Sequence, residues 1–272
     1  MVFVVKNVTP SRRCALRAFC LIISLLPFLA EGGSLREAEI TALIGEGSLL
    51  KAGAVLQPIL PNDRLHDGFG VSTSANSRAE LTFNNQAIVR LSADAALNFK
   101  ARSFLELTRG AVLIEMRRGV KTKIEAAEVA AAISGATAVF DYEAPAFKFL
   151  VLQGTARLYR PRHLGDSILV SAGRMVFGDA RAALTDPVDF DIDRLVKTCP
   201  LIQGFSPLNS EKLMAAECQK QQRAKSKKTL IATNLVIFAG GSTVSIVDPD
   251  KRSSEAEATT TSGSSAASET HR

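Results

Sequence analysis

The stretch that decides the fold is SANSRAELTFNNQAIVRL, residues 74–91. Ala79, Leu81 and Phe83 alternate with polar residues, and a similar alternation resumes after Asn84-Asn85. A period of two places one set of side chains on a buried sheet face and the other set on the opposite, wet face. The stretch therefore predicts two β-strands joined by a turn.

Segments of the same kind follow one another from Ile40 to about Gly178. Gly, Asn, Asp and Pro separate short β-type runs that include ITALIG, AELTF, AIVRL, FLELT, AVLIEM, TKIEA, FKFLVL, TARLY and SILVS. The Ala-rich run AAEVAAAISGATAV is also expected to be strand, because Gly135 interrupts it and β-type runs lie on both sides. Residues 38–180 are therefore predicted to form an all-β domain, a coiled, solenoid-like or sandwiched stack of short strands.

The pattern changes after this domain. DPVDFDIDRLVKTCP and SPLNSEKLMAAECQKQQRAKSKK have apolar positions at helical spacing, which predicts a small helical appendage over residues 181–228. Cys199 and Cys218 lie within it and are predicted to form a disulfide, which would stabilise the fold by about 3 kcal/mol. Two free thiols are the alternative.

Residues 1–32 have the layout of a secretory signal peptide. The basic stretch SRRCALR precedes the apolar run AFCLIISLLPFL, and small residues follow. Cleavage after Ala30 or after Gly32 fits this layout, and an uncleaved anchor is the alternative. In either case the remainder is expected to be exported, to the periplasm or the cell surface.

Two further segments follow the appendage. TLIATNLVIFAGGSTVSIV, residues 229–247, is long enough to span a membrane, but Asn234 and the Gly240-Gly241 pair dilute its apolar character. A membrane anchor and a packed hairpin or loose apolar tail both remain open. Residues 248–272 contain no apolar residue larger than Ala, which predicts a disordered tail.

The charge balance argues against nucleic acid as a partner. The formal net charge is +6, but residues 1–30 contribute four positive charges and no acid, which leaves +2 on residues 31–272. Phosphate binding needs clustered Lys and Arg, and stacking on single strands needs aromatic side chains, which are only 6% of this chain.

No constellation typical of an enzyme is present. His66, His163 and His271 have no partner at a metal-ligand spacing, so we predict no metal site, and no cofactor motif occurs. The turn sequence HLGDS, with His163 and Asp166, is expected to be solvated rather than catalytic. The sequence thus indicates a non-enzymatic protein and disfavours a hydrolase.

Two charged groups could serve binding. Asp186, Asp189, Asp191 and Asp193 lack the Gly and Glu of a calcium loop, so they are expected to be a solvated helix start. The charged set Arg78, Glu80 and Arg90 is expected to lie on the wet side of the sheet. If it binds a ligand, a mixed-charge surface of this kind suits recognition better than catalysis.

The order of these motifs resembles the FecR domain family. The elements are an N-S-R-A-x-L strand, an R-L strand, a leucine-rich strand ending in Gly, a G-T-x-F-like region, a V-L-x-G strand and a closing S-A-G turn. The residues that carry the resemblance are Asn76, Ser77, Arg78, Ala79, Glu80, Leu81, Arg90, Leu91, Gly110, Gly135, Thr137, Gly154 and Gly173. One departure is Ala136, which stands where the family usually has Thr directly after Gly.

The resemblance implies an envelope domain with a role in signalling. Regulatory members of the family resemble anti-sigma factors with a cytoplasmic module, for which the short leader leaves no room. We therefore expect a protein-binding, signal-relay or assembly module that meets an envelope protein partner through exposed strand faces or edges. The alternative is a surface module that binds cell-wall glycan or peptidoglycan.

Overall fold

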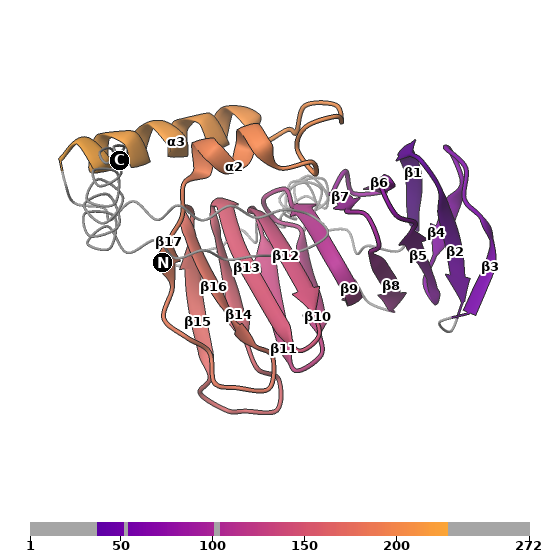
Figure 1. Ribbon diagram of the computed structural model, residues 1–272, viewed down its shortest axis with the longest axis horizontal. Helices are drawn as coiled ribbons and strands as arrows, with labels where there is room; N and C mark the ends of the chain where they lie inside the picture. The colour runs from indigo at the N-terminus through magenta and orange to yellow at the C-terminus, as the bar shows by residue number, and fades with distance from the viewer. Residues whose placement is uncertain (1–36, 52–53, 101–103, 228–272) are drawn as a thin grey trace, which may run out of the picture. The chain divides into compact units, whose positions relative to one another are not determined.

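The computed structural model describes residues 37–51, 54–100 and 104–227 (Figure 1). The chain divides into two compact units, residues 1–32 and residues 33–272, and every described residue lies in the second. The predicted signal peptide, the apolar segment 229–247 and the predicted disordered tail lie outside the described residues.

Seventeen strands and two helices make up the described part of the chain. The strands up to the middle of the domain are β1 (Glu37–Ile44), β2 (Gly47–Lys51), β3 (Ala54–Pro58), β4 (Arg64–His66), β5 (Phe69–Thr73), β6 (Arg78–Phe83), β7 (Ile88–Leu91), β8 (Ala96–Lys100) and β9 (Phe104–Glu115). The later strands are β10 (Lys121–Ala126), β11 (Val129–Ser134), β12 (Thr137–Glu143), β13 (Ala146–Gln153), β14 (Thr155–Tyr159), β15 (Ser167–Ser171), β16 (Arg174–Asp179) and β17 (Val188–Asp189). The helices are α2 (Ile192–Thr198) and α3 (Glu211–Ser226).

The strands pair into two layers that share β9. Sheet A has the order β4-β1-β6-β7-β9-β12-β13-β16-β17. Sheet B has the order β3-β2-β5-β8-β9-β10-β11-β14-β15. Of the pairings between described strands, only that of β9 with β10 is parallel. The chain therefore passes repeatedly between the two sheets, which is the arrangement of a coiled stack of short strands.

Strand β9 passes from sheet B to sheet A at Gly110. Residues before it pair with β8 and β10, and residues from Gly110 onward pair with β12 and β7. Gly110 has φ +81°, and a Cβ there would lie 2.6 Å from the Cα of Ala95. Only glycine adopts this conformation at low cost and also allows so close an approach.

The main core lies between the two sheets. It combines side chains of sheet A, such as Ile40 and Leu81, with side chains of sheet B, such as Val71, Leu97 and Ile124, all of which are fully buried. The predicted all-β fold is confirmed, including the Ala-rich run, which forms β11 and β12.

The opening stretch forms the predicted strand pair. Strands β6 and β7 pair antiparallel through Ala79 and Leu91 at one end and Thr82 and Ile88 at the other. The turn between them includes Gln86 at φ +63°.

The helical appendage covers the outer face of sheet A. Figure 1 shows α2 and α3 side by side, on the same side of β12, β13 and β16. A second apolar cluster joins Leu113 and Leu150 of the sheet to Phe190, Leu195 and Met214 of the appendage. Neither helix of the described part has the length and hydrophobicity of a membrane span.

The predicted Cys199–Cys218 disulfide is absent from the structure, in which both cysteines are free thiols. Other contacts hold the appendage together without a covalent link. The Ile192 amide donates to Gln221 Oε1 over 3.0 Å, and Gln221 Nε2 donates to the Phe190 carbonyl. Burial raises the pKa of Cys199 and of Cys218, which keeps both groups in the thiol form.

Candidate functional site

A buried ion pair lies on the outer face of sheet A. Arg90 Nε on β7 donates to Glu80 Oε2 on β6 over 2.7 Å, and the two side chains are 1% and 10% exposed. Cross-strand pairing places the two residues directly opposite each other. The prediction that Glu80 and Arg90 lie on a wet sheet face is therefore wrong.

The reason is the segment between the two helices, residues 199–210, which lies over this face. Arg78 Nη1 donates to the Pro200 carbonyl over 2.9 Å, and Arg90 Nη1 donates to the Leu201 carbonyl over 3.0 Å. The Phe205 ring centroid lies 4.9 Å from Arg90 Cζ, within cation–π range. The guanidinium groups thus satisfy main-chain carbonyls that have no helix or sheet partner.

Further along the same segment, a side chain of the sheet accepts hydrogen bonds instead of donating them. Glu115 of β9 accepts hydrogen bonds from the main-chain amides of Asn209, over 3.1 Å, and Ser210. Thr137 Oγ1 donates to Ser210 Oγ over 2.8 Å. Arginine side chains of the sheet thus donate to carbonyls of segment 199–210, and the Glu115 carboxylate accepts from main-chain amides of the same segment. These side chains therefore dock the appendage.

A second buried ion pair lies in β12 and β13. Asp141 Oδ2 and Lys148 Nζ are 3.8 Å apart, and among the described residues Lys148 Nζ has no hydrogen-bond partner. Burial raises the pKa of Asp141 and lowers the pKa of Lys148, and the attraction between the two groups opposes both shifts. The charged form of each group is thus stabilised by the opposite charge of its partner.

The remaining motif residues shape turns and the core. Ala79, Leu81 and Leu91 are fully buried. Asn76 has φ +57°, and Ser77 Oγ accepts a hydrogen bond from the Glu46 amide over 2.9 Å. The positive-φ glycines of the motif are Gly110, Gly135, Gly154 and Gly173. The family motif therefore builds the fold and docks the appendage, and it does not assemble a catalytic constellation.

His163 and Asp166 lie in the turn between β14 and β15, as expected. Arg160 brings them together: its Nη2 lies 2.8 Å from His163 Nε2, and its Nη1 lies 3.5 Å from Asp166 Oδ2. The same guanidinium also contacts Glu128 and the Arg181 carbonyl. This is a structural cluster around a buried arginine. His66 is exposed on β4, and His271 lies outside the described residues.

The aspartate group is found at the predicted helix start. Asp191 caps α2 by accepting from the Arg194 amide over 3.0 Å, and Asp193 pairs with Lys197 over 2.7 Å. Asp189 pairs with Arg174 and Asp186 is exposed. Within the described ranges, no three His, Cys, Asp or Glu side chains are grouped as metal ligands.

Strand β3 is the feature that the sequence analysis missed. All five of its residues are exposed, including Val55 at 67% and Leu56 at 52%, and its only strand partner among the described pairings is β2. The nearby Leu60 is 64% exposed. The run AVLQPIL carries the apolar signal, but Pro58 within it and Pro61 directly after it obscured a strand.

The other edges of the two sheets are better protected than β3. Strand β4 is three residues long and exposes Arg64 and His66, and β17 is two residues long. Strand β15 begins and ends with exposed serines, but it is as long as β3 and its Leu169 is 59% exposed. Short length and polar side chains are the usual means of blocking an edge, and β3 has only Pro58 at its end. Among the described strands β3 is therefore the most open edge, because it exposes two large apolar side chains, Val55 and Leu56, whereas β15 exposes one.

Comparison with known proteins finds a family match for part of the β domain. Residues 70–157 match the model of the family described as FecR protein, which confirms the predicted resemblance over that range. The predicted β domain, residues 38–180, extends beyond the match at both ends. No curated protein matches the chain significantly.

Two crystal structures are similar in part. Both are of candidate anti-sigma factors from Parabacteroides distasonis ATCC 8503. The first is 11% identical with a TM-score of 0.42 and covers 71% of this chain and 92% of its own. The second is 9% identical with a TM-score of 0.38 and covers 58% of this chain and 91% of its own. At these TM-scores neither similarity supports a conclusion.

Proposed function

We propose that this protein, whose residues 70–157 match the FecR family, is a non-enzymatic, exported envelope module that binds a protein partner by strand addition at β3. The open edge of β3 carries the proposal. An unpaired strand edge offers a row of main-chain donors and acceptors that only another extended segment can satisfy completely.

The side chains of β3 indicate the chemistry of the partner. The strand, AVLQP, has no charged residue, and Val55 and Leu56 are more than half exposed. Because main-chain pairing gives affinity and side-chain contacts give specificity, a matching segment has apolar residues at alternate positions. Such a contact suits a signal-relay or assembly partner, and in the described part of the chain the apolar cluster of the appendage involves other strands than β3.

The test uses the full-length tagged protein with a photo-crosslinking residue at Gln57, in intact envelopes. We expect a crosslink to one protein, mapped to an extended segment with alternating apolar residues. The variant Val55→Lys/Leu56→Lys places two charges on the edge and should abolish the crosslink. Leu164→Lys is the matched control, because Leu164 is fully exposed in a turn and should leave the crosslink unchanged.

Two results would overturn the proposal. One is a partner whose capture is equal in the double-lysine variant and in the native protein. The other is retention on purified cell-wall glycan without any crosslinked protein, which would favour the glycan-binding alternative.

A further inference from the structure

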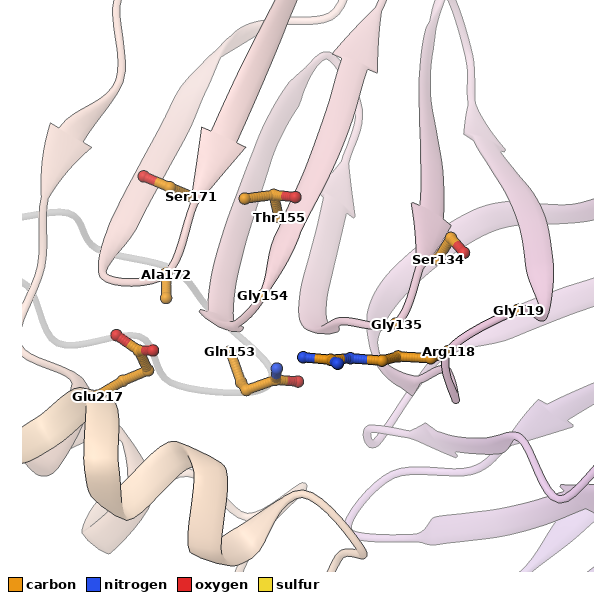
Figure 2. A pocket seen from close by; sticks show the side chains of 10 residues that line it. All are labelled: Arg118, Gly119, Ser134, Gly135, Gln153, Gly154, Thr155, Ser171, Ala172 and Glu217. Atoms are coloured by element: carbon orange, nitrogen blue, oxygen red, sulfur yellow. The ribbon is translucent and has the colours of Figure 1, made fainter.

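A groove of the described structure lies where β11, β14 and β15 meet their turns, and β3 is not part of its lining. Its volume is about 650 Å³, within the range of roughly 300–1,000 Å³ that is typical of ligand pockets. Figure 2 shows that Arg118 and Gln153 extend toward each other along it, with Glu217 of α3 at the far end. The family match spans most of the lining, which includes the motif glycines Gly135 and Gly154, but the sequence analysis assigns no ligand to this groove.

Three hydroxyl groups line one wall. Thr155 of β14 pairs directly with Ser171 of β15, and Ser134 of β11 lies beside Thr155 because the preceding pair is Ile133 with Ala156. Directly opposed residues of antiparallel strands point to the same face, and neighbouring strands are about 4.8 Å apart. We name Ser134, Thr155 and Ser171 the hydroxyl row. All three are exposed.

The polar groups of the groove have unused hydrogen-bonding capacity. The Arg118 guanidinium, a fork of five donors, forms no hydrogen bond or ion pair with any described residue. The Glu217 carboxylate, in contrast, is paired with Lys220 over 2.7 Å. As far as the described residues go, the Arg118 end of the groove thus has a guanidinium without a partner, and the acid at the other end is paired.

Two motif glycines lie in the lining where the chain approaches itself closely. A Cβ at Gly135 would lie 3.1 Å from Arg118 Cγ, and a Cβ at Gly154 would lie 2.7 Å from the Gly135 carbonyl oxygen. The only apolar side chain of the lining is Ala172. A peptide would therefore find no apolar subsite, whereas a polyhydroxylated ligand would find hydroxyl, carboxamide and guanidinium groups.

We propose that this groove binds a carboxylate-bearing oligosaccharide. Its carboxylate pairs with Arg118 in the bidentate geometry that a guanidinium favours. Its hydroxyl groups exchange hydrogen bonds with the hydroxyl row and with Gln153. The site is independent of β3, so either proposal can fail without the other.

The test is isothermal titration of the full-length protein with trigalacturonic acid, neutral maltotriose and a triglutamate peptide. We expect trigalacturonic acid to bind most tightly. Arg118→Gln should weaken that binding about tenfold or more, because a charge-assisted bidentate contact is lost. Arg162→Gln, which removes the same charge from an exposed turn, should change it less than about twofold. Thr155→Val, which retains the side-chain shape, should weaken it about threefold.

Several results would overturn the inference. They are no binding of trigalacturonic acid, equal affinity for maltotriose or triglutamate, and equal weakening by Arg118→Gln and Arg162→Gln. The last would show only general attraction of an anion to a basic surface. Arg118 is exposed, so its variant is expected to remain folded, and circular dichroism checks this.

Discussion

Arg90 Nε on β7 lies 2.7 Å from Glu80 Oε2 on β6, and segment 199–210 buries both side chains. The pair belongs to the strand pair from which the fold was predicted, yet its role is to dock an appendage more than 100 residues later in the chain. Charged residues that the sequence pattern places on a solvent-exposed sheet face therefore join sheet A to the helical appendage.

The first prediction concerns this pair. Arg90→Ala leaves the Glu80 carboxylate buried without its cation and two carbonyls of the segment without donors. Such a change should lower the free energy of unfolding by about 3–5 kcal/mol. Arg64→Ala removes an exposed arginine that pairs with Glu37 and Glu39 over 3.7 Å, and should cost less than about 1 kcal/mol. Urea unfolding measures both, and equal losses would contradict a docking role for Arg90.

The second prediction concerns the passage of β9 between the sheets. Gly110→Ala adds a methyl group 2.6 Å from the Ala95 main chain at a positive φ, so we expect a loss of about 3 kcal/mol or more. Gly119→Ala has a similar φ, +87°, but its Cβ would meet no atom within 4 Å. It should cost only about 1–2 kcal/mol from backbone strain. Thermal unfolding separates the two, and equal costs would show that the close approach has no effect.

The third prediction is a dependence on pH. Burial would raise the pKa of Asp191, but hydrogen bonds from Lys225 and the Arg194 amide outweigh it, so its pKa lies below 3.8. The folded state thus favours the carboxylate. The resulting stability is complete well above pH 4 and is lost as pH falls below 3.8 through the folded-state pKa.

Asp191→Ala should therefore cost about 1 kcal/mol at pH 7, and the difference from the native protein should shrink below pH 4. Asp186→Ala is the control, because Asp186 is exposed and should change stability by less than about 0.5 kcal/mol. Urea titrations at several pH values measure the differences. A cost that does not change between pH 7 and pH 3 would contradict the charge-dependent cap.

The fourth prediction concerns the cysteines. Since burial raises the pKa of Cys199 and Cys218, both should react with iodoacetamide more slowly in the folded protein than in urea. Cys199, which is 4% exposed, should be the slower of the two. Mass spectrometry without reductant measures the extent of alkylation at each cysteine. Failure of both residues to react after unfolding would instead indicate the disulfide that the structure lacks.

Local pattern was sufficient for much of the fold. Alternation at Ala79, Leu81 and Phe83 correctly predicted paired strands, because side chains of a strand alternate between its faces whatever their partners. The spacing around Asp191 correctly predicted a helix start, since a capping bond joins near neighbours in the chain. Strand β3 was missed because prolines followed its short apolar run.

The sequence by itself determined the period of the strands, the positions of the turns and the presence of helices after the β domain, because each depends on residues close together in the chain. Tertiary structure decided which face of β6 and β7 is buried, since Leu201 and Ser206 cover Arg90 only after the chain has folded back. It also decided which edge is open and which polar side chains meet in the groove at Arg118. Those arrangements depend on contacts between distant residues, and no local pattern encodes them.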